Sequence, residues 1–196
     1  MRIIAGKWRG RRIAAPEGRS TRPTGDRVRE ALFSSLHSRI GSFEGLRVLD
    51  AFAGSGALGL ESLSRGAALF AAVESNPKTA RLIEDNYLGL QSPQSTQDDH
   101  DKEFRLYRGD IFRIASRLKN AAFDLGFFDP PYDLSDEKLC ELLELLATYR
   151  AFACGALLVI ERSKQSDPES VLPSCYTCLD VKRKGETILI FAQFTP

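Results

Sequence analysis

The stretch RVLDAFAGSGALGLESLSRG, residues 47–66, decides the fold. An apolar run over 47–52 contains Asp50, a turn with Gly54 and Gly56 follows, and the next residues have the apolar spacing of a helix. A buried strand that turns at glycines into a helix is the first half of a βαβ unit. Together with Gly59, these glycines fit G-x-G-x-x-G, a pattern that lets the backbone approach a ligand at a helix N-terminus.

Apolar runs and helical patterns alternate along the chain. The apolar runs predict further buried strands at 68–74, 104–110, 123–129 and 155–161. Helical spacing predicts helices at 57–66, 76–90, 111–120 and 135–150. Strands that alternate with helices form right-handed βαβ units, so we expect an α/β fold with a doubly wound, mostly parallel sheet.

The last part of the chain has a different character. Residues 174–194 contain two β-rich runs joined by KRKGE, 182–186, which predicts a hairpin with a glycine turn. This hairpin would complete a seven-stranded sheet with an antiparallel last strand. With 196 residues, 43% of them hydrophobic, the chain is expected to form a single domain, 1–196, whose core spans 46–196.

The N-terminal forty residues are basic, although the whole chain has a net charge of only +1. They hold ten Lys and Arg against three Asp and Glu, which indicates either a surface for a polyanion or a merely solvated basic arm. Residues 1–23 predict a basic hairpin around GKWRG, and 24–40 predict a covering helix capped by Thr24. The apolar face of that helix is expected to comprise Val28, Ala31, Leu32, Ser35 and Leu36.

The glycine pattern alone serves both dinucleotides and S-adenosylmethionine, with Glu74 at the end of the next strand placed to hold ribose hydroxyls. Asp50 distinguishes between these two kinds of cofactor. A carboxylate just before the glycine loop would repel a pyrophosphate, whereas it would attract the ammonium and sulfonium groups of S-adenosylmethionine. The sequence therefore favours S-adenosylmethionine over a nicotinamide dinucleotide.

Asp110 follows the third predicted strand. Its carboxylate could accept from the adenine amine, with Ile111 or Phe112 covering the ring, because ligands of open α/β sheets bind at the carboxyl edge. It could equally be the N-cap of the next helix. The two roles are compatible.

The fourth predicted strand ends in Asp129-Pro130-Pro131-Tyr132, which we call the proline elbow. Proline cannot continue a strand or a helix, so these residues form a rigid turn. A carboxylate and a proline carbonyl only accept hydrogen bonds and suit the two N–H donors of an exocyclic amine, while a tyrosine ring can stack on an extruded base. A plain loop is the alternative, but the elbow's place next to a nucleotide site favours an amine clamp.

Metal, membrane and secretory functions have little support. The only cysteine pair at zinc spacing, Cys175 and Cys178, has no second pair, so buried or free thiols are expected and no metal. The chain lacks a long apolar stretch and a secretory h-region, so we expect a soluble cytoplasmic protein.

The motifs RIIAGKWRGRRI, RPTGDRVREALF, DAFAGSGALGLESLSRGA and FFDPPY, in this order, resemble the bacterial RsmD family of class I amino-methyltransferases. The resemblance implies a Rossmann-like fold and methylation of N2 of guanine 966 in small-subunit (16S) ribosomal RNA, with S-adenosylhomocysteine as product. It implies that the methionyl part of the cofactor is cradled by Asp50, Phe52, Gly54, Ser55 and Gly56. Glu74 would hold the ribose and Asp110 the adenine. The guanine amine would be oriented by Asp129 and the Pro130 carbonyl, with Tyr132 on the base.

We expect RNA to be gripped by the basic residues ahead of the core, Lys7, Arg9, Arg11, Arg12, Arg22 and Arg27, with Thr24 in the same segment. Trp8 could stack on a base, but packing beneath the hairpin is favoured. The partner would be 16S ribosomal RNA or an assembling small subunit, and the protein is expected to be a monomer.

Three rivals stay open. A DNA adenine-N6 methyltransferase would share the clamp but need a further target-recognition region. An NAD-dependent oxidoreductase would fit the glycines but not Asp50. A non-catalytic RNA-binding protein would have no use for the elbow.

Two features depart from the family pattern. Gly126 interrupts a predicted central strand, where it is expected to loosen packing, and the polar segment 91–103 is expected to form an unusually long exposed loop.

Overall fold

The computed structural model describes residues 1–16, 26–92 and 103–196. The chain forms two compact units, 1–109 and 110–196, which are described separately below. Most of the predicted 91–103 loop lies outside the described residues.

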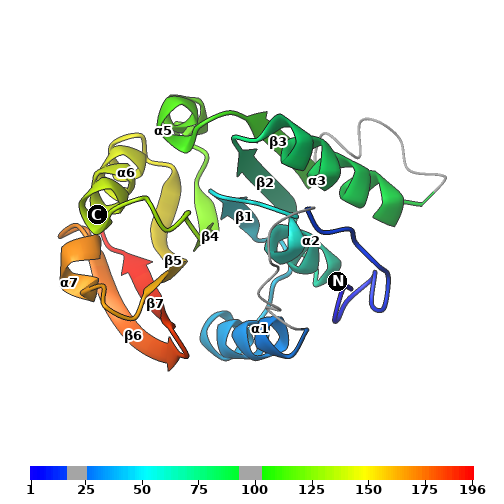
Figure 1. The fold of residues 1–196 in the computed structure, drawn as a ribbon, viewed down its shortest axis with the longest axis horizontal. Coiled ribbons are helices and arrows are strands. Elements are labelled where there is room, and N and C mark those ends of the chain that lie inside the picture. The colour runs from blue at the N-terminus through cyan, green and yellow to red at the C-terminus, as the bar shows by residue number, and fades with distance from the viewer. Residues whose placement is uncertain (17–25, 93–102) are drawn as a thin grey trace. The chain divides into compact units, whose positions relative to one another are not determined.

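The first unit is built on three parallel strands in the order β3-β2-β1 (Figure 1). Its elements are α1 (Asp26–Ile40), β1 (Arg47–Asp50), α2 (Ala57–Ser64), β2 (Leu69–Glu74), α3 (Pro77–Leu90) and β3 (Phe104–Arg108). Helices α2 and α3 are the crossovers of two successive βαβ units and pack on the strands that they join. The predicted alternation of strands and helices is therefore confirmed in this unit.

The glycines of the turn after β1 serve both conformation and packing. Gly56 has a φ of 76°, a left-handed value that favours glycine, and it is the N-cap residue of α2. A Cβ on Gly59 would lie 2.0 Å from a ring carbon of Phe70, so only glycine lets α2 approach β2 this closely. The third glycine of the pattern thus serves contact between helix and strand.

Residues 1–16, here called the N-terminal arm, fold back on themselves as predicted. The Ile3 N–H donates to the Arg11 carbonyl at 2.9 Å, and the Gly10 N–H donates to the Ile3 carbonyl at 2.9 Å. Regular pairing within the arm is limited to one antiparallel bridge between Arg2 and Arg12. Trp8 is 6% exposed and its ring meets Tyr87 edge-on at 6.4 Å, which confirms packing rather than exposure for base stacking.

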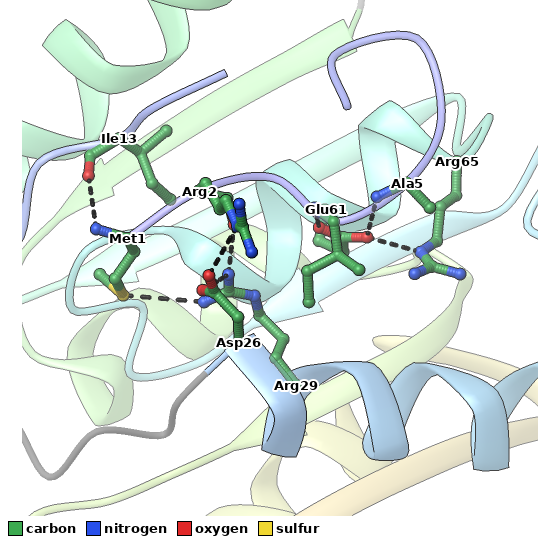
Figure 2. Close-up of polar contacts among 9 residues, drawn as sticks. Met1, Arg2, Ala5, Ile13, Asp26, Arg29, Glu61 and Arg65 are labelled. Atoms are coloured by element: carbon green, nitrogen blue, oxygen red, sulfur yellow. Dashed lines mark hydrogen bonds and ion pairs between the residues drawn. The ribbon is translucent and has the colours of Figure 1, made fainter. Parts of the chain in front are cut away.

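A buried acid holds the arm against α2 (Figure 2). Glu61 is fully buried, and its carboxylate accepts from the N–H groups of Ile4 at 2.7 Å and Ala5 at 3.0 Å. The same carboxylate pairs with Arg65 at 2.8 Å. Further along the arm, the Lys7 N–H donates to the carbonyl of Ser64 at 2.7 Å.

The predicted buried face of α1 is partly wrong. Ala31 is exposed, whereas Arg29 and Phe33 are buried beside the expected Leu32 and Leu36. Phe33 is drawn inward because its ring packs on Phe43, with centroids 5.3 Å apart. The Arg29 guanidinium, 2% exposed, donates to Asp26 and to the Arg2 carbonyl, so the buried face of α1 is rotated away from Ala31 toward Arg29 and Phe33 (Figure 2).

The second unit carries strands in the order β4-β5-β7-β6. Its elements are α5 (Ile111–Ile114), the 3-10 helix η1 (Ala115–Leu118), β4 (Phe123–Phe128), α6 (Asp136–Thr148), β5 (Phe152–Ser163), α7 (Pro168–Val171), β6 (Tyr176–Lys184) and β7 (Thr187–Phe194). Strand β4 pairs with β5 in parallel, and β7 is antiparallel to both β5 and β6. The expected seven-stranded mixed sheet with an antiparallel last strand is confirmed.

Three local predictions in this unit need correction. The single helix expected at 111–120 is α5 followed by a 3-10 turn, and α7 was not predicted. Strand β5 begins at Phe152, earlier than expected. The predicted start of α6 is confirmed, because Ser135 is its N-cap and accepts from the Lys138 N–H.

Gly126 tightens packing, contrary to the expectation that it loosens β4. A Cβ at this position would lie 2.8 Å from the ring of Phe152 on β5 and 3.0 Å from the ring of Phe128. Phe152 in turn packs on Phe123 and Phe128, so the glycine makes room for an aromatic cluster. A β-branched residue here would displace these rings.

Replacing Gly126 with valine is expected to destabilise the protein by about 1–3 kcal/mol, because it overpacks this cluster. Urea unfolding would measure the change. A second replacement, Phe152→Leu, removes the ring that the new side chain meets, so the double variant should lose less than the sum of the two single losses. Strict additivity would show that the two positions do not compete for space.

Candidate cofactor loop and proline elbow

The turn after β1, residues 50–56, is called the cofactor loop. Asp50 ends β1 and is 3% exposed. Its Oδ1 accepts from the Phe52 N–H at 3.3 Å, and the Ala53 N–H donates to the Val73 carbonyl at 3.0 Å. The loop is thus tied to the end of its own strand and to neighbouring β2, with a buried carboxylate at its start.

Glu74 at the end of β2 contacts the same loop. Its Oε2 accepts from the Gly54 N–H at 3.0 Å, and its Oε1 accepts from the Asn76 N–H at 2.8 Å. An ionised carboxylate can accept about four hydrogen bonds, so Glu74 can support the loop and still accept from a pair of hydroxyls. The ribose role of Glu74 stays a prediction.

The peptide between Ser55 and Gly56 is held on both sides. The Gly56 N–H donates to the Ala53 carbonyl at 2.7 Å, and the Asn86 Nδ2 donates to the Ser55 carbonyl at 3.0 Å. Asn86 was missed by sequence reasoning. The sequence pattern that could have indicated Asn86 is its helical spacing from Ile83 and Leu90, which places a polar side chain among the buried residues of α3.

The proline elbow belongs to the second unit and follows β4. Pro130 is buried, Asp129 and Pro131 are exposed, and Tyr132 is 71% exposed. The Leu134 N–H closes the turn by donating to the Pro131 carbonyl at 3.0 Å. The elbow is therefore a turn with an anchored proline and an outward aromatic ring.

Arg162 on β5 supports the chain immediately after the elbow. It is 9% exposed, donates to the Leu134 carbonyl at 2.8 Å, and pairs with Asp136 at 2.6 Å. Asp136 also accepts from the Ser166 hydroxyl at 3.1 Å. Sequence reasoning missed Arg162, for which the only signal was a cation at the end of an apolar strand.

Asp110 is the N-cap residue of α5 and accepts from the Phe112 N–H at 3.0 Å, so that alternative is confirmed. A second role toward adenine stays a prediction. Ile111 is 3% exposed.

The predicted RNA-binding residues divide into two groups. Arg11 donates to the carbonyls of Leu90 at 2.7 Å and Gly89 at 2.6 Å, at the C-terminal end of α3, and Lys7 pairs with Glu103. These two side chains therefore also hold the arm in place. Arg9, Arg12 and Arg27 are exposed. Arg22 and Thr24 lie outside the described residues.

The structure brings the predicted cofactor residues of the first unit together, namely Asp50, Phe52, Gly54, Ser55, Gly56 and Glu74. Asp110 and the elbow belong to the second unit. A shared cleft between the loop and the elbow stays a prediction.

The four cysteines are free thiols. Partial burial raises the pKa of Cys140 and Cys175, so both remain protonated at neutral pH and are poor metal ligands. The described residues hold no cluster of three or more His, Cys, Asp or Glu side chains suited to a metal ion. Within 1–16, 26–92 and 103–196, no helix combines the length and the apolar character that a membrane span needs.

The family whose model is described as "Conserved hypothetical protein 95" matches residues 1–193. The chain belongs to this family. It is 35% identical to the Bacillus subtilis protein YlbH over 87% of this chain and 88% of that protein. It is 32% identical to the "Ribosomal RNA small subunit methyltransferase D" of Haemophilus influenzae, over 94% of this chain and 89% of the relative.

A solved structure of the Escherichia coli protein yhhF has a TM-score of 0.78 and 30% identity, covering 100% of this chain and 98% of the other. This likeness over the whole length confirms the Rossmann-like methyltransferase fold that the sequence predicted. The resemblance to the RsmD family is likewise confirmed.

Proposed function

We propose that this protein is an S-adenosylmethionine-dependent methyltransferase that modifies the N2 amine of a guanine in small-subunit ribosomal RNA. The observation that carries the proposal is the cofactor loop, in which buried Asp50 precedes the glycines and the Glu74 carboxylate accepts from the Gly54 N–H. The relatives named as small-subunit ribosomal RNA methyltransferases support the RNA substrate.

The residues of the loop fit S-adenosylmethionine. Asp50 offers a buried negative charge to the ammonium and sulfonium groups, and Glu74 has acceptor capacity left for two ribose hydroxyls. Gly54 has a φ of 55°, and among the described residues beyond its chain neighbours only the Phe52 carbonyl lies within 4 Å of a Cβ placed there, at 3.9 Å, so the backbone is open to a ligand. When bound, the cofactor supplies an electrophilic methyl group and leaves as S-adenosylhomocysteine.

The Asp50→Asn variant is expected to bind S-adenosylhomocysteine about 10- to 100-fold more weakly, because a hydrogen bond to a charged group contributes about 1.5–3 kcal/mol. Calorimetric titration would measure the affinity. Asp85→Asn, which changes an exposed acid on α3, is the matched control and should leave the affinity unchanged. Equal affinities for S-adenosylhomocysteine in the two variants would show that Asp50 does not bind the cofactor.

The proline elbow is the proposed amine clamp. The Asp129 carboxylate and the Pro130 carbonyl accept from the two N–H groups of the guanine amine, whose lone pair is then held toward the methyl group. The exposed ring of Tyr132 stacks on the base. After transfer, the proton passes from the amine to Asp129 or to solvent.

Tritium transfer from labelled S-adenosylmethionine tests the proposal as a whole. The acceptors are small-subunit ribosomal RNA, assembled small subunits, DNA, and buffer alone. We expect label in the ribosomal RNA, free or assembled, at the guanine N2. Label only in DNA, or in no acceptor despite cofactor binding, would contradict the proposal.

The N-terminal arm is the proposed RNA contact, with Arg9 and Arg12 exposed for phosphates. Two glycines of the arm allow a matched test. Gly6 and Gly10 have φ values of 81° and 82°, so alanine is similarly strained at both. At Gly6 the new Cβ would meet backbone, 1.7 Å from the Ser64 carbonyl oxygen, whereas at Gly10 no atom of another described residue, chain neighbours aside, lies within 4 Å.

Gly6→Ala is therefore expected to undock the arm and weaken RNA binding. The slope of log affinity against log salt concentration should also become shallower, by about one for each phosphate that the arm no longer neutralises. Gly10→Ala should leave the arm docked and the slope unchanged. Filter binding across a salt series would compare them. The same RNA affinity and slope for both variants would show that a docked arm is not needed for RNA.

A further inference from the structure

Asn86 on α3 uses its amide to join two segments that are distant in the sequence. It is 7% exposed. Its Oδ1 accepts from the Ala14 N–H at 2.8 Å, and its Nδ2 donates to the Ala14 carbonyl at 3.0 Å and to the Ser55 carbonyl at 3.0 Å. A primary amide has two N–H donors, so one is spent on the arm and the other on the cofactor loop.

The bond to Ser55 selects one orientation of a peptide that could adopt others. Ser55 lies between Gly54 and Gly56, whose φ values are 55° and 76°. Glycine has no steric preference for one sign of φ, so a residue flanked by two glycines, and the peptide that follows it, can reorient at low cost. Asn86 holds its carbonyl side while the Ala53 carbonyl holds its N–H side, and this determines which groups the loop presents to a ligand.

The bond pair to Ala14 is one of several attachments of the arm. Glu61 and Ser64 hold Ile4, Ala5 and Lys7 on α2, and those contacts touch no residue of the cofactor loop. Asn86, in contrast, is bonded to the arm and to the loop through the same side chain. The two N–H donors of Asn86 belong to one planar amide. A shift of the Ser55 carbonyl that turns this amide therefore also moves the donor and acceptor that hold Ala14.

We propose that Asn86 is a positioning residue that couples the docking of the N-terminal arm to the geometry of the cofactor loop. The identity of the two ligands rests on the proposed function. By linkage, RNA bound on the arm then strengthens cofactor binding by the same factor that the cofactor strengthens RNA binding.

The first experiment needs no RNA. Amide hydrogen exchange of arm residues 3–14 is measured with and without S-adenosylhomocysteine, in the full-length protein. In the wild type, the ligand is expected to slow exchange at the Ala14 amide several-fold. In Asn86→Asp, which keeps an acceptor for the Ala14 N–H but loses both donors, the ligand should bind and leave exchange in the arm unchanged.

Ser64→Ala is the control for a merely structural effect. The Ser64 hydroxyl accepts from the Trp8 N–H at 3.0 Å and donates to the Ala5 carbonyl, so its removal loosens the arm without touching the loop. Exchange in the arm should rise in this variant, yet S-adenosylhomocysteine should still slow it. Loss of the ligand effect in Ser64→Ala as in Asn86→Asp would overturn the assignment to Asn86.

The second experiment measures S-adenosylhomocysteine affinity with and without saturating small-subunit ribosomal RNA. In the wild type, we expect RNA to raise the affinity for S-adenosylhomocysteine about fivefold or more, which is the lower end of measured couplings. In Asn86→Asp, the affinities with and without RNA should be about equal. A ratio of the two affinities that is the same in both proteins would overturn the inference while leaving the proposed function intact. Failure of the wild type to bind S-adenosylhomocysteine would overturn both.

Discussion

Asp129→Ala is expected to lower the rate of methyl transfer about 10²–10³-fold, by analogy with the cost of removing one preorganised hydrogen-bonding group from a reacting centre. Asp129 is an exposed residue of the proline elbow and lies outside the cofactor loop. The affinity for S-adenosylmethionine should therefore change little. Single-turnover rates with ribosomal RNA and calorimetric titration with S-adenosylhomocysteine would separate the two effects.

Two variants make this test specific. Asp133→Asn removes an exposed acid from the same turn and should leave the rate unchanged. Asp129→Asn keeps the shape of the side chain and one acceptor oxygen but loses the negative charge, so its rate should lie between those of the wild type and the alanine variant. Near-normal turnover in Asp129→Ala would refute the clamp.

Glu61→Ala is expected to cost about 3–5 kcal/mol of unfolding free energy, as does the loss of one partner from a buried ion pair. The carboxylate is fully buried and serves the N–H groups of Ile4 and Ala5 as well as Arg65. Without it, these backbone donors lose their acceptor and the arm undocks. Urea unfolding would give the loss of stability.

Trp8, the only tryptophan, reports the arm in the same experiment. Its ring is buried in the docked arm, so its emission should shift toward that of exposed tryptophan in Glu61→Ala even before unfolding. Glu84→Ala is the matched control, because Glu84 pairs with Arg108 at the surface, with 42% and 53% of the two side chains exposed. It should cost no more than about 1 kcal/mol. Equal losses for the two glutamates would contradict the role given to Glu61.

The regular elements were largely predictable because their determinants are local. The β1 strand, the glycine turn and α2 follow from consecutive residues, and the N-caps at Asp110 and Ser135 use donors two or three residues away. The ends and buried faces of helices were predicted less accurately. The helix expected at 111–120 ends as a 3-10 turn, and Ala31 is exposed because the ring of Phe43 and the carboxylate of Asp26 draw Phe33 and Arg29 inward.

The sequence by itself determined the alternation of strands and helices, the acidic and glycine-rich cofactor loop, and the rigid proline elbow, since spacing and backbone chemistry within a few residues set them. Only the tertiary structure decided what Glu61, Asn86 and Arg162 do. Each is a buried polar side chain with partners that lie some 26 to 72 residues away in the chain. A polar group taken out of water must find hydrogen-bond partners, and no local pattern shows which distant backbone groups the fold will bring to it.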